Sequence, residues 1–213
     1  METRHIQENR MMDSSILLPE LKVIAPQLPD AMLLHYIRQS AIEFAKRSQC
    51  VTRDICFDVQ CGVDEYPIFL DDNEVFVSFQ DHTVQSECCG SKSCKETKCN
   101  GYTVSWSAPR QRLVLSPKPS TSSQICLCVA VAPSLTACEF DERLISENYD
   151  GILHGAKLRI HALPRSKESD NAFDKNMIPY HERKYNAAIS NAGIDRLTNN
   201  TRGRFKMCKP RVI

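Results

Sequence analysis

The sequence predicts an α+β fold, in which a three-helix part carries a projecting antiparallel β-module and both chain ends form extended arms. Three observations predict it. Apolar residues follow helical spacing in residues 30–49, alternate with polar residues through much of residues 51–134, and return to helical spacing after Glu139. A chain of 213 residues, of which 42% are hydrophobic and 25% charged, is long enough and apolar enough to fold as one such domain.

The N-terminal part of the chain is predicted to be an arm followed by helices. Residues 1–15 are polar and lack a period, which is typical of a flexible arm that orders on contact with a partner. Residues 16–50 then form the first helical part, with a short turn before Pro26 and an amphipathic helix that has Asp30 as N-cap and ends at Gln49. The apolar stripe of this helix recurs at spacings of three and four: Leu33, Leu34, Ile37, Ala41, Phe44 and Ala45.

Residues 51–134 are predicted to form the β-module. Ile55, Phe57 and Val59 alternate with polar residues, as the side chains of a half-buried strand do. Turn sequences separate the apolar runs, so we expect an antiparallel sheet or small sandwich of about five or six strands. A cysteine-rich insert, residues 86–99, interrupts the module.

Residues 139–197 are predicted to form a two-helix part that packs on the first helix. Its first helix carries an apolar stripe and should end at Pro164. Its second helix begins at about Asp170, with Pro179 either in an early turn or at a kink, and Gly193 is a plausible local break. The stripe of the first helix is Leu144, Ile145, Tyr149, Ile152, Leu153, Ala156, Ile160 and Leu163.

Composition and charge exclude some classes of protein. The formal net charge of +1 argues against a chain that coats nucleic acid through bulk electrostatics. No window approaches the ~20 consecutive apolar residues that span a bilayer, and Met1 is not followed by a secretory apolar core, so we expect a soluble protein made in the cytosol, with no membrane partner. Cysteines are numerous, 11 in all, but they do not prove secretion, because a chain of this length needs no disulfide staples.

Several stretches follow one another in an order that resembles one family. A glycine turn leads into an aromatic strand at residues 65–68, and further strands follow at residues 101–105, 113–119 with a Pro-x-Pro turn, and 125–134. A helix with a Gly-Ala step then lies at residues 149–158. In this succession the chain resembles the head-to-tail adaptor, or connector, proteins of tailed bacteriophages over about residues 16–195. The cysteine-rich insert departs from the family pattern.

The resemblance implies an architectural role for the chain. It implies a structural virion protein that forms a homo-oligomeric ring, a dodecamer of twelve copies, and that binds the portal protein of the capsid above and a tail or nozzle protein below. Viral DNA would pass through the ring during ejection. The expected location is the head-tail junction of the virion, after assembly in the host cytoplasm, and the chain would not be an enzyme.

Residues 198–213 form a basic C-terminal tail without an acidic residue. Asn199, Asn200 and Gly203 argue against a helix there. We expect this tail to order against an acidic groove on the portal protein or on a neighbouring subunit, and a solvated, disordered tail is the alternative for the free monomer. The residues predicted to form this interface are Arg202, Arg204, Phe205, Lys206, Lys209 and Arg211.

The cysteine-rich insert is the candidate metal site, with His82 nearby. Zinc accepts tetrahedral thiolate and imidazole ligands, but the spacing of these cysteines differs from the two-residue knuckle of common zinc sites. Three states therefore remain open, namely zinc, disulfides formed after the particle leaves the cell, and free thiols in a loop, of which free thiols are favoured. The rival hypothesis for function is a small zinc-binding nucleic-acid module that uses this cluster and the basic tail. The cluster comprises Cys88, Cys89, Cys94 and Cys99.

Two further groups of residues can carry chemistry. His154 and His161 are seven residues apart on one predicted helix and share a face, with His181 as a third partner on the next helix. No carboxylate pair, nucleophile elbow or phosphate loop accompanies them, so we expect a surface or interface role and assign no catalytic residue. Cys126 and Cys128 share one face of a strand and are interpreted as small buried hydrophobes.

Overall fold

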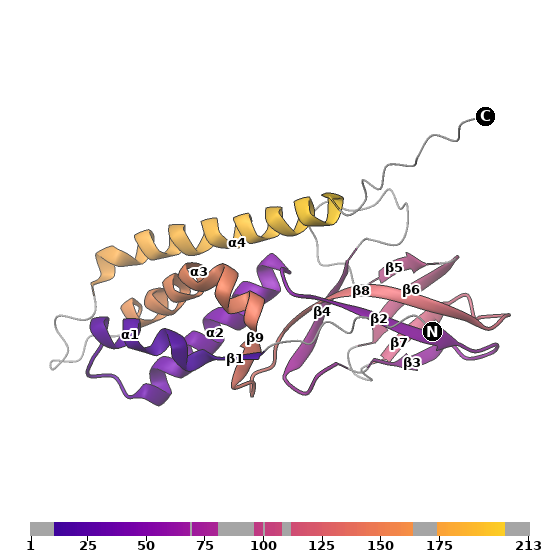
Figure 1. The fold of residues 1–213 in the computed structure, drawn as a ribbon, viewed down its shortest axis with the longest axis horizontal. Coiled ribbons are helices and arrows are strands. Elements are labelled where there is room, and N and C mark those ends of the chain that lie inside the picture. Colours follow the sequence, from indigo (N-terminus) through magenta and orange to yellow (C-terminus); the bar gives the residue numbers. More distant parts are fainter. Residues whose placement is uncertain are drawn as a thin grey trace.

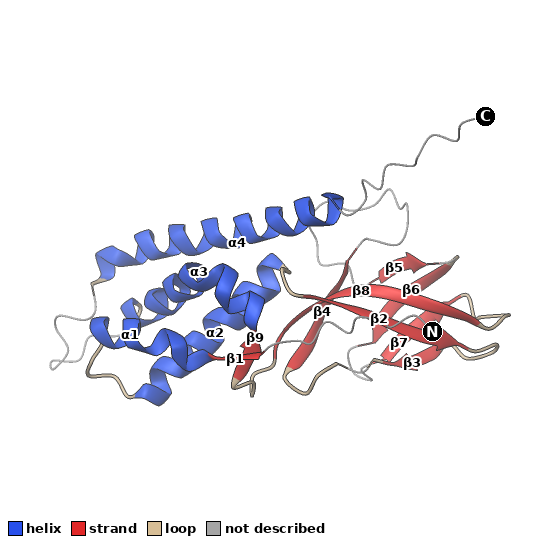
Figure 2. Ribbon diagram, in the orientation of Figure 1, coloured by secondary structure: helices blue, strands red, loops and turns tan. Residues whose placement is uncertain are grey.

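The computed structural model describes residues 11–68, 70–80, 96–99, 101–107, 112–163 and 174–202. The protein is a mixed α+β structure with antiparallel sheets, which confirms the α+β class of the prediction. In Figure 1 the helices gather at one end of the molecule and the large sheets at the other. Figure 2 shows the same division by element type, with the short strands β1 and β9 beside the helices.

The described residues contain four α-helices and two 3-10 turns. Helices α2, α3 and α4 contact one another, and α1 packs beside α2 and α3. Figure 1 shows α4 running along α3 and extending beyond it toward the sheets. The elements are η1 (Ser14–Leu17), α1 (Leu18–Ile24), α2 (Asp30–Ser48), α3 (Glu142–His161), η2 (Lys175–Met177) and α4 (Ile178–Arg202).

The strands form three antiparallel sheets in the described part of the chain. One pairs β1 (Met11–Asp13) with β9 (Glu139–Asp141). The second has the order β2 (Thr52–Val59), β8 (Ser123–Pro133), β4 (Glu74–Gln80). The third has the order β3 (Glu65–Pro67), β7 (Arg112–Ser116), β6 (Tyr102–Ser107), β5 (Glu96–Cys99). The β-module thus has seven described strands where the alternation predicted about five or six. The additional strand is β5, which lies within the predicted cysteine-rich insert, where no apolar alternation marks a strand.

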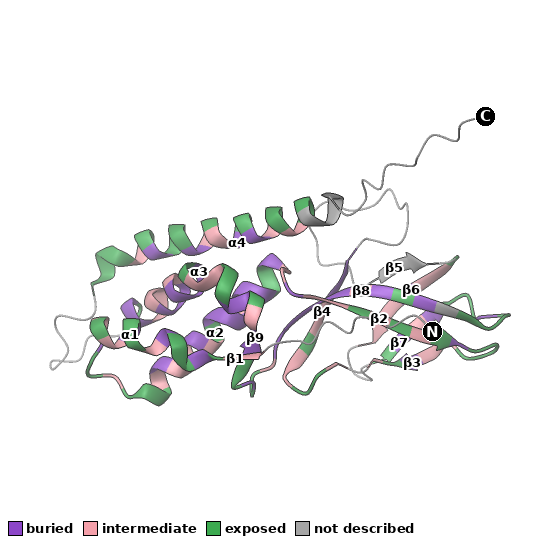
Figure 3. Ribbon diagram, in the orientation of Figure 1, coloured by how far each residue is buried: buried purple, intermediate pink, exposed green. Residues whose placement is uncertain are grey.

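The helical part is held together by a close approach of α2, α3 and α4. Ser40 Oγ on α2 donates a hydrogen bond to the carbonyl oxygen of Ile152 on α3 at 2.7 Å. The Tyr185 hydroxyl on α4 donates to the carbonyl oxygen of Ser40 at 2.9 Å. Gly155 on α3 makes this approach possible, because a Cβ atom there would lie 2.1 Å from Ser40 Oγ. Figure 3 shows buried residues on the sides of α2, α3 and α4 that face one another.

Part of the predicted N-terminal arm is folded. Met11–Asp13 form β1, and Asp13 Oδ1 caps η1 by accepting a hydrogen bond from the Ser15 amide at 2.8 Å. Residues 11–15 therefore belong to the folded part, because β1 pairs with β9, a strand more than 120 residues away that no local period reveals. Residues 1–10 of the predicted arm lie outside the described residues.

The predicted helix starts are displaced by a few residues. Asp30 is the first residue of α2 and Pro29 is its N-cap, so the predicted cap is wrong by one position. After Glu139 the chain forms β9 before α3 begins. Asp141 is the N-cap of α3, and its Oδ1 accepts a hydrogen bond from the Arg143 amide at 2.8 Å. A capping carboxylate of this kind satisfies an otherwise unbonded backbone donor.

Helix α4 begins at Ile178, later than the predicted start near Asp170, and ends at Arg202, beyond the predicted end of the two-helix part at residue 197. Pro179 lies in its first turn, which was one of the two predicted alternatives, and the helix runs through Gly193 without a break. It also includes residues 198–202, which were predicted to be part of a non-helical tail. Packing explains the continuation through Gly193, because Ile189 and Ala192 in the turn before it are buried against the core and outweigh the cost of a single glycine.

Candidate functional site

Three histidines gather at the interface of α3 and α4 and are here named the histidine cluster: His154, His161 and His181. His154 Nδ1 and His181 Nδ1 lie 2.8 Å apart. The rings of His161 and His181 are stacked, with centroids 5.2 Å apart and planes inclined by 10°. The structure thus confirms that His154 and His161 share a face of one helix and that His181 joins them.

The histidine cluster is largely withdrawn from solvent. His161 and His181 are 6% and 5% exposed, and the ring of Tyr180 meets the rings of both His154 and His181 edge-on. Burial is the largest cause that lowers the pKa of each of the three histidines. For His181 burial, together with the other two histidines and Lys157, lowers the pKa to about 4. The three side chains are therefore neutral at neutral pH.

Two of the three histidines are joined by a hydrogen bond. Among the described residues, no group of three or more His, Cys, Asp and Glu side chains is arranged to hold a metal ion. The contact between His154 and His181 is a hydrogen bond between two ring nitrogens, in which one nitrogen carries the proton and the other accepts it. Either ring can be the donor, because each neutral imidazole has two tautomers, with the proton on Nδ1 or on Nε2.

A second group of polar residues joins the helical part to the β-module. Arg53 Nη2 on β2 donates hydrogen bonds to Glu74 Oε1 on β4 and, at 2.8 Å, to Asp141 Oδ2 at the start of α3. The three side chains are only 16%, 7% and 9% exposed. Burial raises the pKa of Glu74 although Arg53 opposes the rise. Because Asp141 also caps α3, this buried triad ties the first turn of that helix to two strands.

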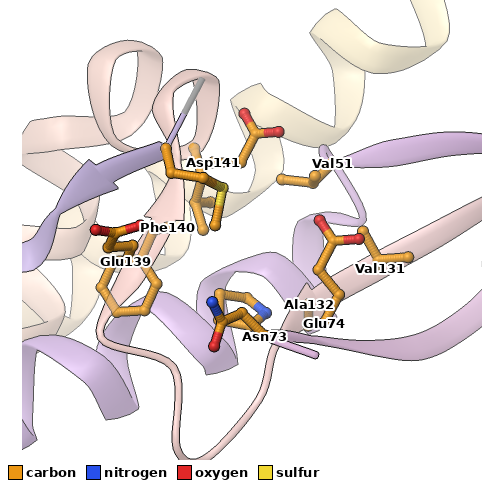
Figure 4. Close-up of a pocket in the computed structure, with 11 residues that line it drawn as sticks. Val51, Asn73, Glu74, Val131, Ala132, Glu139, Phe140 and Asp141 are labelled. Atoms are coloured by element: carbon orange, nitrogen blue, oxygen red, sulfur yellow. The ribbon is translucent and has the colours of Figure 1, made fainter. Parts of the chain in front are cut away.

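A small hollow lies beside this triad (Figure 4). Figure 4 shows the side chains of Glu74, Glu139 and Asp141 around it, with Phe140 among them. Its walls come from β1, β4, β8, β9 and the start of α3, so it lies where the helical part meets the sheets. We interpret it as a structural joint, since two of its lining carboxylates, those of Glu74 and Asp141, are already engaged in the triad and the cap.

The cysteines of the β-module differ from the prediction. Cys56 and Cys126 occupy facing positions on β2 and β8 and form a disulfide. Cys126 is exposed, so its interpretation as a buried hydrophobe is wrong; the buried face of β8 carries Ile125 and its alternate neighbours instead. Cys128 is a half-buried free thiol, and burial followed by the charge of Asp54 raises its pKa to about 12. Strand alternation showed that the two cysteines of β8 share a face, but only the pairing with β2 identifies their environment.

The residues predicted as the metal and portal sites lie mostly beyond the described part of the chain. Cys99 is the last residue of β5, and Cys88, Cys89 and Cys94 lie outside the described residues. Arg202 ends α4, and the rest of the predicted interface also lies outside: Arg204, Phe205, Lys206, Lys209 and Arg211.

The outward side of α4 between residues 187 and 198 forms an exposed face with little charge, here named the α4 face. Ile194 and Leu197 are each 57% exposed on it. Figure 3 shows this outward side as exposed along most of the helix. Its exposed residues include one charged side chain: Ala187, Ser190, Asn191, Ile194, Asp195, Leu197 and Thr198. Exposed aliphatic residues with few charges are typical of the central part of a protein interface.

Comparison with known proteins leaves the chain without an assigned family. No protein-family model matches the sequence, and no curated protein sequence matches it significantly. Within the described residues, no helix combines the length and the apolar character that crossing a membrane requires.

Proposed function

We propose that this chain is a structural adaptor of a tailed bacteriophage, one subunit of a ring that joins the portal vertex of the capsid to the tail. The proposal rests on the ordered resemblance over residues 16–195. The structural observation that best supports it is the α4 face, because a ring subunit needs an exposed surface of low charge with which to contact the next subunit.

The arrangement of the elements suits such an assembly. In a ring, the α4 face of one subunit packs against a different surface of the next, and this head-to-tail contact closes after a fixed number of copies. The resemblance implies twelve. The helices would form the ring body, the β-module would project toward the next tail component, and the ring would line the passage of viral DNA. The basic tail of residues 198–213 continues directly from α4, which ends at Arg202, so in a ring the tails of neighbouring subunits would start from equivalent positions.

Charge placed on the α4 face tests the proposal. The double variant Ile194→Lys and Leu197→Lys should remain folded, because both residues are exposed, but should no longer form rings on the portal protein of the same phage. The matched control is Glu182→Lys, an exposed and already charged position on the same helix. Circular dichroism checks folding, and negative-stain images of mixtures with portal rings check assembly.

The same images test the basic tail. Removal of residues 203–213 leaves α4 complete and should abolish docking of a folded monomer onto portal rings. Failure of the unaltered chain to add a ring to the portal would sink the adaptor proposal. Docking by the double lysine variant would remove only the assignment of the α4 face, and docking by the truncated chain would remove only that of the tail.

A further inference from the structure

We propose that the histidine cluster is an acid-sensitive latch, which holds the first turns of α4 against α3 while its imidazoles are neutral and releases them when they become protonated. This inference does not depend on the adaptor proposal. It concerns residues 178–184, the part of α4 that carries His181.

The contact between His154 and His181 tolerates only one proton. Their Nδ1 atoms lie 2.8 Å apart, which is a hydrogen-bond distance and requires one N–H donor and one bare nitrogen as acceptor. If both rings are protonated, two N–H groups and two positive charges face each other across the same distance. The hydrogen bond is then lost and the two rings repel.

The third histidine, His161, adds to the burial of the cluster, so a protonated ring there is poorly solvated. His161 stacks on His181, and both residues are at least nine-tenths buried. His161 Nδ1 is itself buried without a hydrogen-bond partner in the described residues. A proton added to either ring therefore meets poor solvation, and poor solvation disfavours the charged form.

The charged side chains that face the cluster favour protonation of some of its histidines and disfavour that of others. Lys157 on α3 faces all three histidines, and Lys184 on α4 faces His154. Three carboxylates act in the other direction: Asp150 and Glu20 face His154, and Asp174 faces His161. Glu20 also lies 3.8 Å from Lys157, so part of its charge is directed at the lysine. The groups that act on His181 are the two other histidines and Lys157, all of which disfavour its protonation.

The direction of the pH effect follows from these contacts. The pKa of His181 is about 4 in the closed arrangement and 6.5 for a solvated histidine, so the open arrangement binds more protons between these values. Closure is fully favoured above pH 6.5 and is lost as the pH falls toward 4. Between pH 7.5 and pH 4.5, His181 alone shifts the equilibrium toward the open form about 70-fold.

The rest of α4 has contacts that do not depend on histidine. Tyr185 is hydrogen-bonded to Ser40 on α2, and Arg196 Nη1 donates to Gln49 Oε1 at 2.8 Å. Ile189 and Ala192 are buried in the core. Opening is therefore expected to stay local to the first turns rather than to unfold the whole helix.

Hydrogen exchange of the full chain, followed by mass spectrometry and corrected for the intrinsic pH dependence of exchange, tests the latch. Between pH 7.5 and pH 4.5, peptides covering residues 178–184 should lose tens of fold in protection, while peptides covering residues 189–198 keep theirs. The variant His181→Gln keeps a hydrogen-bonding side chain that does not titrate, and its protection at residues 178–184 should change with pH much less than that of the unaltered chain, because only His154 and His161 remain to titrate. The control His35→Gln removes an exposed histidine on α2 and should respond as the unaltered chain does.

Two results would overturn the proposal. One is protection of residues 178–184 that does not depend on pH in the unaltered chain, and the other is an equal loss of protection in His181→Gln. Because that variant could fail to fold, an NMR titration of the histidine ring protons in the unaltered chain provides a second measurement. It should show histidine signals that titrate well below pH 6.5, and titration of all signals near 6.5 would contradict the latch.

Discussion

Replacing Gly155 by alanine should destabilise the protein, although alanine favours helices. In an exposed helix the change from glycine to alanine stabilises by about 1 kcal/mol. At Gly155 the new Cβ atom would lie 2.1 Å from Ser40 Oγ and 2.5 Å from Tyr185 Cε2, both far inside van der Waals contact. Either α2 and α4 move away from α3, or the two side chains leave their positions.

Neither side chain is free to move. Ser40 Oγ is held by its hydrogen bond to Ile152, and the Tyr185 hydroxyl by its hydrogen bond to the backbone of Ser40. Tyr185 is 2% exposed, and burial raises its pKa to about 12. Overpacking costs about 1–3 kcal/mol, and a lost buried hydrogen bond costs about 1 kcal/mol more. After the gain in helix propensity, we expect Gly155→Ala to lower the free energy of unfolding by about 1–3 kcal/mol.

Urea denaturation followed by far-ultraviolet circular dichroism measures this difference. The matched control is Gly193→Ala on α4, where the nearest atom to a new Cβ is the carbonyl oxygen of Ser48, 3.8 Å away. This contact is ordinary, so the control should gain about 0.5–1 kcal/mol. A Gly155→Ala protein as stable as the unaltered chain, or changes of the same sign in both variants, would refute the close approach of the three helices.

The remaining predictions concern the buried triad and the thiols. Arg53→Ala leaves two carboxylates buried without their cation and should lower the free energy of unfolding by about 3–5 kcal/mol in the same urea assay. Arg112→Ala removes an arginine from a solvent-exposed ion pair and should cost less than about 1 kcal/mol; equal losses would contradict the burial of the triad. The pKa of about 12 for Cys128 predicts slow alkylation at mildly alkaline pH, while the exposed Cys61 and Cys138 react quickly, as mass spectrometry of labelled peptides would show. Labelling of Cys128 as fast as that of the other two would contradict its burial.

The long helices and the alternating strands could be predicted because their signals are local. The stripe from Leu33 to Ala45 repeats at the helical period, and Ile55 and Phe57 alternate at the strand period. Even the shared face of His154 and His161 follows from their spacing of seven. The places where local signals failed are short or atypical, such as β1 and the helical residues after Gly193.

The candidate sites depended on distances between residues that are far apart in the sequence. No period indicates that Cys56 faces Cys126, or that Arg53 meets a carboxylate at the start of α3. Each contact needs a particular pairing of strands or helices, and many pairings are compatible with the same local pattern. His181 is the clearest case, because its helix was predicted but its contact with His154 depends on how α3 and α4 pack.

The sequence by itself determined the class of fold, the order of its elements and most of the buried stripes, since these depend on residues within one or two turns or along one strand. It also supplied the succession of elements that the proposed adaptor function rests on. Only the tertiary structure decided which charges, thiols and imidazoles meet. The physical reason is that hydrogen bonds, ion pairs and shifts in pKa act over a few ångströms, and packing alone brings residues from distant segments within that range.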